Sequence, residues 1–343
     1  MSSKNTNKIS ADAYIPVTLL TDIRKRHSEE CTSELAGLQL SNFLYNVRMS
    51  RYYPGILGFE GALKKIPAII IGVGPSLTPN VIKLLKENRR NVILVSVDAS
   101  LPLLAKQELY PHFCVMVDPT EKQRNNFEGI DTKKFYTIVP PIVHPSIFRI
   151  VDPKHLAIYN VKDPKSELME QAPYHTGKKG ALPAGVLTSG SAFAFAAICG
   201  CDPIIFVGHD LCWHTPDKVY AEGISGDKRN FQMSVKFRGG CLLFPDIHGK
   251  LVLTHETFVV FWAWMRDMVG CMQQRVINCT GEGILAMKGI RQMKLDRVMK
   301  VYGNKELVGL EEKITKAYNY EIADGYVERL LVPKFKKTIE VVK

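Results

Sequence analysis

Pro67-Ala-Ile-Ile-Ile-Gly-Val-Gly-Pro-Ser-Leu77 is the stretch that decides the fold class. It begins with an apolar run without polar alternation, which is typical of a parallel strand buried on both faces. The glycine-rich turn Gly72–Leu77 follows, and a helix is expected over about 80–88 because its apolar residues recur at helical spacing. The order of buried strand, glycine turn and helix indicates the first unit of an α/β sheet.

Further apolar strands and helices extend this unit in both directions along the chain. Strands are expected at 92–97 and 113–117 with a helix at 101–109 between them, a spacing that predicts a doubly wound parallel sheet, Rossmann-like and of the α/β class. Additional strands are expected at 135–139, 156–159, 203–208, 251–254 and 275–278, helices at 17–36, 191–199 and 255–269, and a loop at 163–185. The predicted organisation is an N-terminal helical extension (1–60), the Rossmann-like domain (61–290) and a C-terminal helical segment (291–343).

The composition fits a folded, cytoplasmic chain. Of 343 residues, 46% are hydrophobic, which excludes wholesale disorder. The longest apolar stretch, Ala192–Cys201, has 10 residues, whereas a membrane span needs ~20, and the polar N-terminus has no signal-peptide core. Eight scattered cysteines, several within apolar runs, favour reduced thiols and therefore the cytoplasm.

The net charge points to an anionic ligand. Lys and Arg number 45 against 34 Asp and Glu, which gives +11. No aromatic-basic stacking pattern accompanies the charge, so a solvated surface around a phosphate-bearing ligand is favoured over a nucleic-acid platform.

The glycine turn is the sharpest candidate site. Gly72 and Gly74 let the backbone approach a ligand, and Ser76 with the helix N–H groups can bind phosphate, although a plain strand-to-helix turn has the same pattern. Asp98 lies 24 residues after Gly74, near the ~20 expected for a ribose-binding carboxylate, with helix capping as the alternative. Asp118 follows the next strand and suits a cation, a hydroxyl or a turn.

Two further segments carry polar groups at strand or helix ends. Ser189, Gly190 and Ser191 precede a small-residue helix and suit either an anion or simple capping. His209 and Asp210 follow Gly208 at a strand end, with His214 close behind. A histidine there is a candidate general base, or else a structural hydrogen-bonding group. The absence of H-E-x-x-H and G-x-S-x-G excludes zinc-protease and α/β-hydrolase motifs.

Five ordered segments resemble one superfamily, that of the motility-associated-factor (Maf) glycosyltransferases and the MptE-like 6-hydroxymethylpterin pyrophosphokinases. They cover roughly residues 60 to 290 and are 67–77, Ser96-Val-Asp98, Pro111–Pro119, Gly200–Leu211 and Val276-Ile-Asn-Cys-Thr280. The resemblance implies an enzyme with a Rossmann-like core related to bacterial sialyltransferases.

In the Maf branch the implied reaction transfers a nonulosonic, sialic-acid-like sugar from a CMP-activated donor to a hydroxyl of a protein or glycan acceptor. The candidate catalytic residues are His209, Asp210 and His214. The implied nucleotide-binding residues are Gly72, Gly74, Pro75, Ser76, Leu77, Asp98, Asp118, Ser189, Gly190, Ser191, Gly208, Asn278 and Thr280.

In the pyrophosphokinase branch, ATP with magnesium meets a pterin alcohol, and magnesium is then the implied cofactor. That branch has a more acidic D-x-D-G-like third motif, whereas this chain has Val117-Asp118-Pro119-Thr120, which favours the Maf branch. Two positions depart from the family pattern: His209 replaces the usual Gln, and Tyr220 lies where a His is expected. A nucleotide-binding module without catalysis is the third hypothesis, and no metal ligands are assigned.

Overall fold

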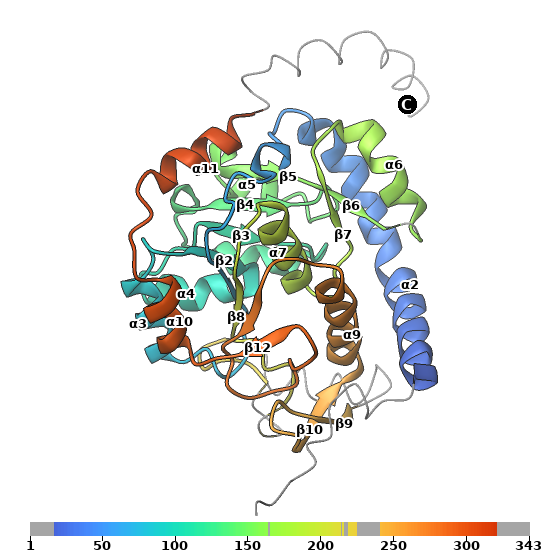
Figure 1. Ribbon diagram of the computed structural model, residues 1–343. Coiled ribbons are helices and arrows are strands. Elements are labelled where there is room, and N and C mark those ends of the chain that lie inside the picture. Colours follow the sequence, from blue (N-terminus) through green and yellow to red (C-terminus); the bar gives the residue numbers. More distant parts are fainter. Residues whose placement is uncertain (1–16, 164, 214, 216–218, 225–240, 321–343) are drawn as a thin grey trace, which may run out of the picture.

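The centre of the molecule is an eight-stranded sheet with the order β12-β11-β8-β1-β2-β3-β4-β5 (Figure 1). The computed structural model describes residues 17–320 apart from 164, 214, 216–218 and 225–240. Neighbouring strands of this sheet all pair in parallel, which confirms the predicted α/β class. The strands are β1 (Ala68–Ile71), β2 (Ile93–Val97), β3 (Phe113–Val115), β4 (Tyr136–Val139), β5 (Leu156–Ile158), β8 (Ile204–Val207), β11 (Val276–Asn278) and β12 (Ile290–Gln292).

The chain reverses its direction of growth between β1 and β8. From β1 it adds strands on one side as far as β5, and it then returns to place β8, β11 and β12 on the other side. Ile71 at the end of β1 pairs with Ser96 of β2 and with Val207 of β8. Ligands of open α/β sheets bind at the carboxyl ends of strands beside such a switch point. The Gly72–Leu77 turn leaves β1 at this place.

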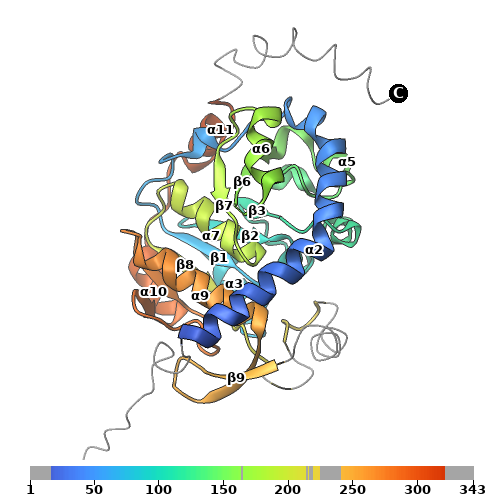
Figure 2. The ribbon, with the colours of Figure 1, turned by 90° about the vertical axis from the view of Figure 1, so that its right-hand side faces the viewer.

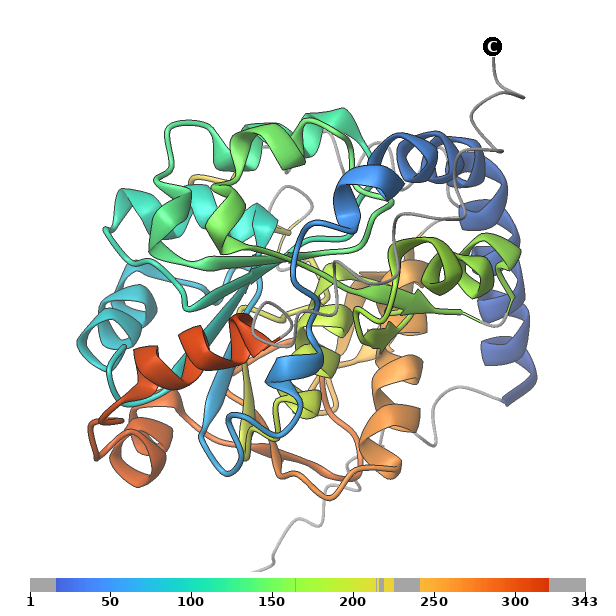
Figure 3. The ribbon, with the colours of Figure 1, turned by 90° about the horizontal axis from the view of Figure 1, so that it is seen from above.

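Helices cover both faces of the sheet (Figure 3). Along β1, Ile69 and Ile71 pack on one face, whereas Ile70 packs on the other, because successive strand side chains alternate. The first face holds α3 (Pro79–Glu87), α4 (Leu101–Lys106) and α10 (Leu295–Tyr302), and the second holds α7 (Thr188–Ile198), α9 (Glu256–Gly270) and α11 (Leu310–Tyr318). No helix in the described ranges is long and apolar enough to cross a membrane. The seven cysteines whose side chains are described form no disulfide.

The N-terminal helix α2 (Val17–Ser50) continues 14 residues beyond its predicted end at residue 36. It packs against α9 and α6 (Glu167–Thr176) (Figure 2). Asn42 donates hydrogen bonds to the carbonyls of Pro119 at 2.9 Å and Ile142 at 3.0 Å. These long-range contacts outweigh the helix-ending signal of Gly37, and they make α2 a support for loops that follow β3 and β4.

The prediction of a loop at 163–185 is wrong, because this segment contains α6 and β7 (Ala181–Pro183). The hydroxyl of Ser166 caps α6 by accepting from the Met169 N–H, and Glu167 and Glu170 suit its positive end. Pro173 lies inside this helix nevertheless. The prediction followed its proline and glycine signals and missed the cap. Strand β7 pairs with β6 (Asn160–Lys162), and β9 (Cys241–Pro245) pairs with β10 (Leu251–His255) in a second small sheet.

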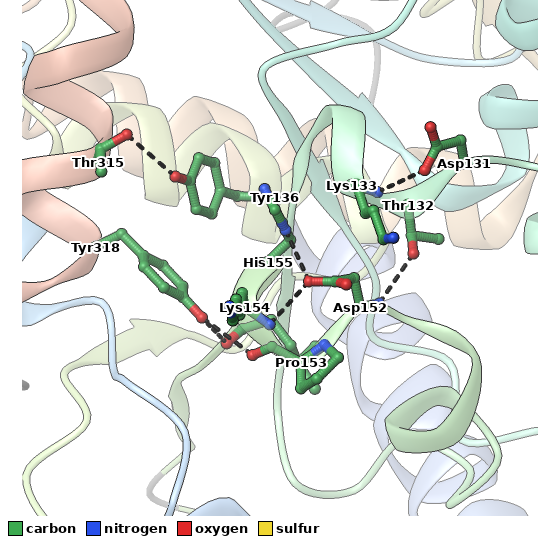
Figure 4. Close-up of polar contacts among 11 residues, drawn as sticks. Asp131, Thr132, Lys133, Tyr136, Asp152, Pro153, Lys154, His155, Thr315 and Tyr318 are labelled. Carbon is green, nitrogen blue, oxygen red and sulfur yellow. Dashed lines mark hydrogen bonds and ion pairs between the residues drawn. The ribbon is translucent and has the colours of Figure 1, made fainter.

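Helix α11 lies near the amino ends of β4 and β5, and Figure 4 shows its Thr315 and Tyr318 beside Tyr136 and Pro153. The Tyr318 hydroxyl donates to the carbonyls of Pro153 at 3.3 Å and Leu156 at 3.2 Å. The Tyr136 hydroxyl and Thr315 Oγ1 lie 3.3 Å apart. These contacts fasten the C-terminal helix to the sheet. The predicted division at residues 60 and 290 stays a prediction, with β12 lying across the second boundary.

Candidate active site

The turn after β1 lies against the loop after β8. Gly74 N donates to the Gly208 carbonyl at 2.8 Å, and Leu77 N donates to Gly74 O at 2.9 Å. The Ser76 hydroxyl donates to Asp210 Oδ2 at 2.7 Å, with Ser76 N at 3.3 Å from the same oxygen. The structure therefore brings these predicted site residues together. Their donors, however, are engaged within the chain, and the carboxylate of Asp210 occupies the side of the turn predicted for phosphate.

The two glycines of this turn are needed for that close approach. A Cβ at Gly74 would overlap Asp210 Oδ2, and one at Gly72 would overlap the Gly208 carbonyl. The segment after residue 218 adds to the enclosure, since Ala221 N donates to Val73 O at 2.7 Å. Packing between β1 and β8 therefore accounts for both glycines without a ligand.

His209 is enclosed at the end of β8 and is 2% exposed. Its Nδ1 lies 2.9 Å from the Val207 carbonyl, which only accepts, so Nδ1 carries the proton. Nε2 then accepts from the Ser189 hydroxyl at 2.9 Å. Burial lowers the pKa of His209 to about 4, against smaller opposing effects of the Val207 hydrogen bond and the Asp210 charge. The imidazole is neutral at pH 7 and is a weak base.

The last sequence motif supports this same loop. His209 N donates to Thr280 Oγ1 at 3.1 Å, and Thr280 N donates to Asn278 Oδ1 at 3.1 Å. Asn278 Nδ2 in turn donates to Leu285 O at 3.2 Å and to Gln292 Oε1 at 3.0 Å. Asn278 and Thr280 thus connect the ends of β8, β11 and β12.

Asp98 and Asp118 form a second group, at the ends of β2 and β3. Asn126 Nδ2 donates to Asp98 Oδ2 at 2.8 Å and to Gln123 Oε1 at 2.9 Å. Gln123 Nε2 donates to Asp118 Oδ2 at 2.6 Å. Two amides from the 3₁₀ helix at 121–127 therefore connect the two carboxyl groups.

The two carboxyl groups have different surroundings. Asp98 is 4% exposed, and its burial raises its pKa to about 7; the hydrogen bond from Asn126 opposes this rise, and the nearby charge of Asp118 adds to it. Asp118 Oδ1 accepts from the N–H of Thr120 at 2.8 Å and from its hydroxyl at 2.6 Å. Asp98 can therefore exchange a proton near neutral pH, while Asp118 is held by three donors.

The sequence identified the carboxylates but missed the residues that connect them. Gln123 and Asn126 lie three residues apart, which places them on one side of a 3₁₀ helix, but the segment has no apolar period that would reveal it.

His214 lies outside the described residues. Gly190 N donates to Leu187 O at 2.8 Å inside the first turn of α7. Among the described residues, no group of three or more His, Cys, Asp and Glu side chains could hold a metal ion.

Comparisons with known proteins identify the family from the sequence and a similar fold from the structure. A family model described as "6-hydroxymethylpterin diphosphokinase MptE-like" matches residues 41–216. The structure of a Maf glycosyltransferase from Magnetospirillum magneticum AMB-1 is similar to this fold with a TM-score of 0.58 and 14% identity. That match covers 84% of this chain and 44% of the other, so the chain spans less than half of the length of the solved protein. No curated protein matches the sequence. Since the family model covers half of the chain, the protein belongs to the MptE-like family.

Proposed function

We propose that the protein transfers a sialic-acid-like sugar from a CMP-activated donor to a hydroxyl acceptor. The observation that carries the proposal is Asp98, a buried carboxyl at the carboxyl end of β2 whose pKa is raised to about 7. General bases work best when their pKa lies near the operating pH. Asp98 fits this requirement, whereas His209, whose pKa is lowered to about 4, does not.

In the proposed reaction the acceptor oxygen attacks the anomeric carbon of the donor. The bond between that carbon and the phosphate oxygen breaks, and CMP leaves with the electron pair. The ionised form of Asp98 takes the proton from the acceptor hydroxyl. Asn126 holds one Asp98 oxygen in place, and the Gln123 amide connects this arrangement to Asp118. General-base catalysis of this kind typically contributes about 10²–10⁴-fold.

Three observations support a CMP-activated acidic sugar as the donor. The fold matches a Maf glycosyltransferase over 84% of the chain. The sequence at the end of β3, 117–120, offers one carboxylate rather than an acidic cluster. The net charge of +11 suits a donor that carries a phosphate and a carboxylate. A nucleotide-sugar donor and a protein or glycan hydroxyl are then the expected partners.

The description of the family model favours a second candidate, diphosphate transfer from ATP to a pterin alcohol. The same base would serve, because that reaction also removes a proton from an attacking hydroxyl. ATP would arrive with magnesium, and Asp98 and Asp118 are the carboxylates at the strand ends that could face it. The two candidates differ in the nucleotide.

Thermal denaturation with added ligands separates these candidates. A ligand that binds only the folded state adds about 2.7 kcal/mol at 100 times its Kd, which gives a visible rise in Tm. We expect CMP to raise Tm, with cytidine as the control that lacks phosphate. A rise with ATP and magnesium but not with CMP would replace the glycosyltransferase proposal by diphosphate transfer. If no nucleotide acts, both nucleotide-dependent reactions are contradicted.

The base is tested by Asp98→Asn in a transfer assay with a CMP-activated nonulosonic acid. We expect kcat to fall by about 10²–10⁴-fold, because the amide cannot accept the proton. Asp267→Asn, which removes an exposed carboxylate on α9, is the matched control and should retain activity. Wild-type kcat in a folded Asp98→Asn variant would show that Asp98 is not the base.

A further inference from the structure

The basic residues of the first helix after the glycine turn are already neutralised. Each of the four cations around α3 has an acidic partner within 4.0 Å. The pairs are Lys83 with Glu87, Lys86 with Glu108, Arg89 with Glu311 and Arg90 with Glu306. Basic residues near the predicted phosphate turn therefore add little free positive charge to it.

The connection between β12 and α10 differs in this respect. Among ion pairs between described residues, none includes Arg291, Lys294 or Arg297, and all three side chains are exposed. These cations share an open depression of about 400 Å³. Its lining consists of Arg291, Gln292, Met293, Lys294, Asp296 and Arg297. With three cations against one carboxylate, the lining carries a net positive charge.

The backbone adds to this positive charge. Helix α10 begins at Leu295, and its N-cap residue Lys294 provides no side-chain cap. The exposed N–H groups and the helix dipole place partial positive charge at that end. Arg291 and Arg297 also offer planar donor pairs that match phosphate oxygens.

The depression lies at the same edge of the sheet as the candidate active site. Gln292 pairs with Asn278 of β11, and Met293 N donates to Asn278 O at 3.0 Å. Cys279, directly after β11, packs against the apolar cluster that contains Leu295 and Val298 of α10. The depression is therefore next to the loop that carries Thr280, on the β8 side of the switch point.

We propose that this depression, rather than the Gly72–Leu77 turn, is a binding site for a phosphate group. The turn presents the Asp210 carboxylate and has its donors engaged, whereas the depression presents unpaired cations and an uncapped helix end. Phosphate is a compact dianion that suits a small concave basic site. The inference does not depend on the proposed transfer reaction, because it concerns phosphate binding alone.

Calorimetric titration of the full chain with inorganic pyrophosphate tests the site. In the triple variant Arg291→Gln, Lys294→Gln, Arg297→Gln we expect affinity to fall at least 10-fold. The matched control Lys83→Gln, Lys86→Gln, Arg90→Gln removes the same charge from around α3 and should stay within about twofold. Equal losses in both variants, or no loss in the first, would overturn the site.

Two additional variants keep the test decisive. Arg297→Gln alone is expected to weaken binding severalfold and serves if the triple variant does not fold, which circular dichroism shows. Ser76→Ala removes the hydroxyl of the turn and should leave pyrophosphate affinity unchanged. A loss confined to Ser76→Ala would move the phosphate site back to the turn.

Titration with CMP identifies the source of the phosphate. If the nucleotide provides it, CMP competes with pyrophosphate and loses affinity in the triple variant, while cytidine binding is unaffected. If a second substrate provides it, pyrophosphate binds equally well at saturating CMP. Pyrophosphate binding without any CMP binding would contradict the proposed donor and leave the phosphate site standing.

Discussion

The carboxyl edge of the sheet is built differently on the two sides of β2. Toward β8, the polar groups satisfy one another: Ser76 donates to Asp210, and Ser189 donates to a neutral His209. Toward β3, two carboxyl groups lie close enough to interact, and burial has raised the pKa of Asp98 to about 7. Both halves are hydrogen-bonded, but only the half toward β3 contains a buried carboxyl group whose ionised form is disfavoured by burial.

This difference distinguishes groups that stabilise the fold from a group that can take part in proton transfer. Groups that pair inside the chain stabilise the strand ends, whereas a carboxyl with a raised pKa destabilises the folded state whenever it is ionised. Folded proteins retain such groups most often at functional sites. In the proposed reaction, proton transfer therefore takes place at Asp98, and His209, one of the three catalytic candidates named from the sequence, supports the scaffold.

The strongest test of this difference is the dependence of stability on pH. The pKa of Asp98 is raised from 3.8 to about 7, so its favourable contribution is present below pH 3.8 and is lost as pH rises to about 7. The loss is about 4 kcal/mol. In urea unfolding, the free energy of Asp98→Asn minus that of the wild type should therefore increase by this amount between pH 4 and pH 8.

The contribution of His209 to the free energy of unfolding should change with pH in the opposite direction. Its folded pKa is lowered from 6.5 to about 4, so the stability is present above pH 6.5 and is lost as pH falls to about 4. The expected loss is about 3 kcal/mol in the wild type and is absent in His209→Gln. Other buried groups such as His112 contribute equally to the pH dependence of wild type and variant, so their contributions cancel when the two free energies of unfolding are subtracted. If the difference in free energy of unfolding between variant and wild type changed with pH in the same direction for Asp98→Asn and His209→Gln, the β3 side and the β8 side of the sheet edge would not differ as described.

A smaller effect is expected from the glycine turn. Gly74→Ala places a methyl group on Asp210 Oδ2 and against the Gly208 carbonyl, so the free energy of unfolding should fall by about 1–3 kcal/mol. Gly37→Ala is the matched control, because a Cβ there meets nothing within 4 Å in the middle of α2. It should gain about 1 kcal/mol. An unaltered unfolding curve for Gly74→Ala would mean that the turn is open and available to a ligand.

The sequence was sufficient for seven of the eight strands of the main sheet, because their signals are local, whereas β12 was not predicted. Short apolar runs rich in β-branched residues, such as 67–71 and 92–97, indicate buried strands, and Gly72 marks the turn after the first of them. Helix ends were less certain: the contacts of Asn42 with Pro119 and Ile142 extend α2, and they span 77 and 100 residues of sequence.

The sequence predicted which residues lie at the carboxyl ends of the strands, but it did not predict the chemical role of each residue. Asp98 and His209 both follow buried strands, and nothing local shows that one gains a raised pKa and the other a lowered one. Both pKa shifts come mainly from burial, which arises from tertiary packing, with smaller opposing effects of the Asn126 hydrogen bond on Asp98 and of the Val207 hydrogen bond on His209. The predicted phosphate turn likewise gave no sign that Asp210, 134 residues away from Ser76, would occupy it.

The smallest expected effect concerns Ser189, whose hydroxyl donates to Nε2 of His209. Ser189→Ala should lower the free energy of unfolding by about 1 kcal/mol, the usual net value of one neutral hydrogen bond. Transfer activity should stay within a few fold, because a histidine whose pKa is about 4 is a weak base and the pair serves as support. Steady-state kinetics and urea unfolding of the same preparation measure both quantities. A drop of 100-fold or more in kcat with unchanged stability would instead make Ser189 and His209 a proton relay, and the reactive half of the site would then lie at β8.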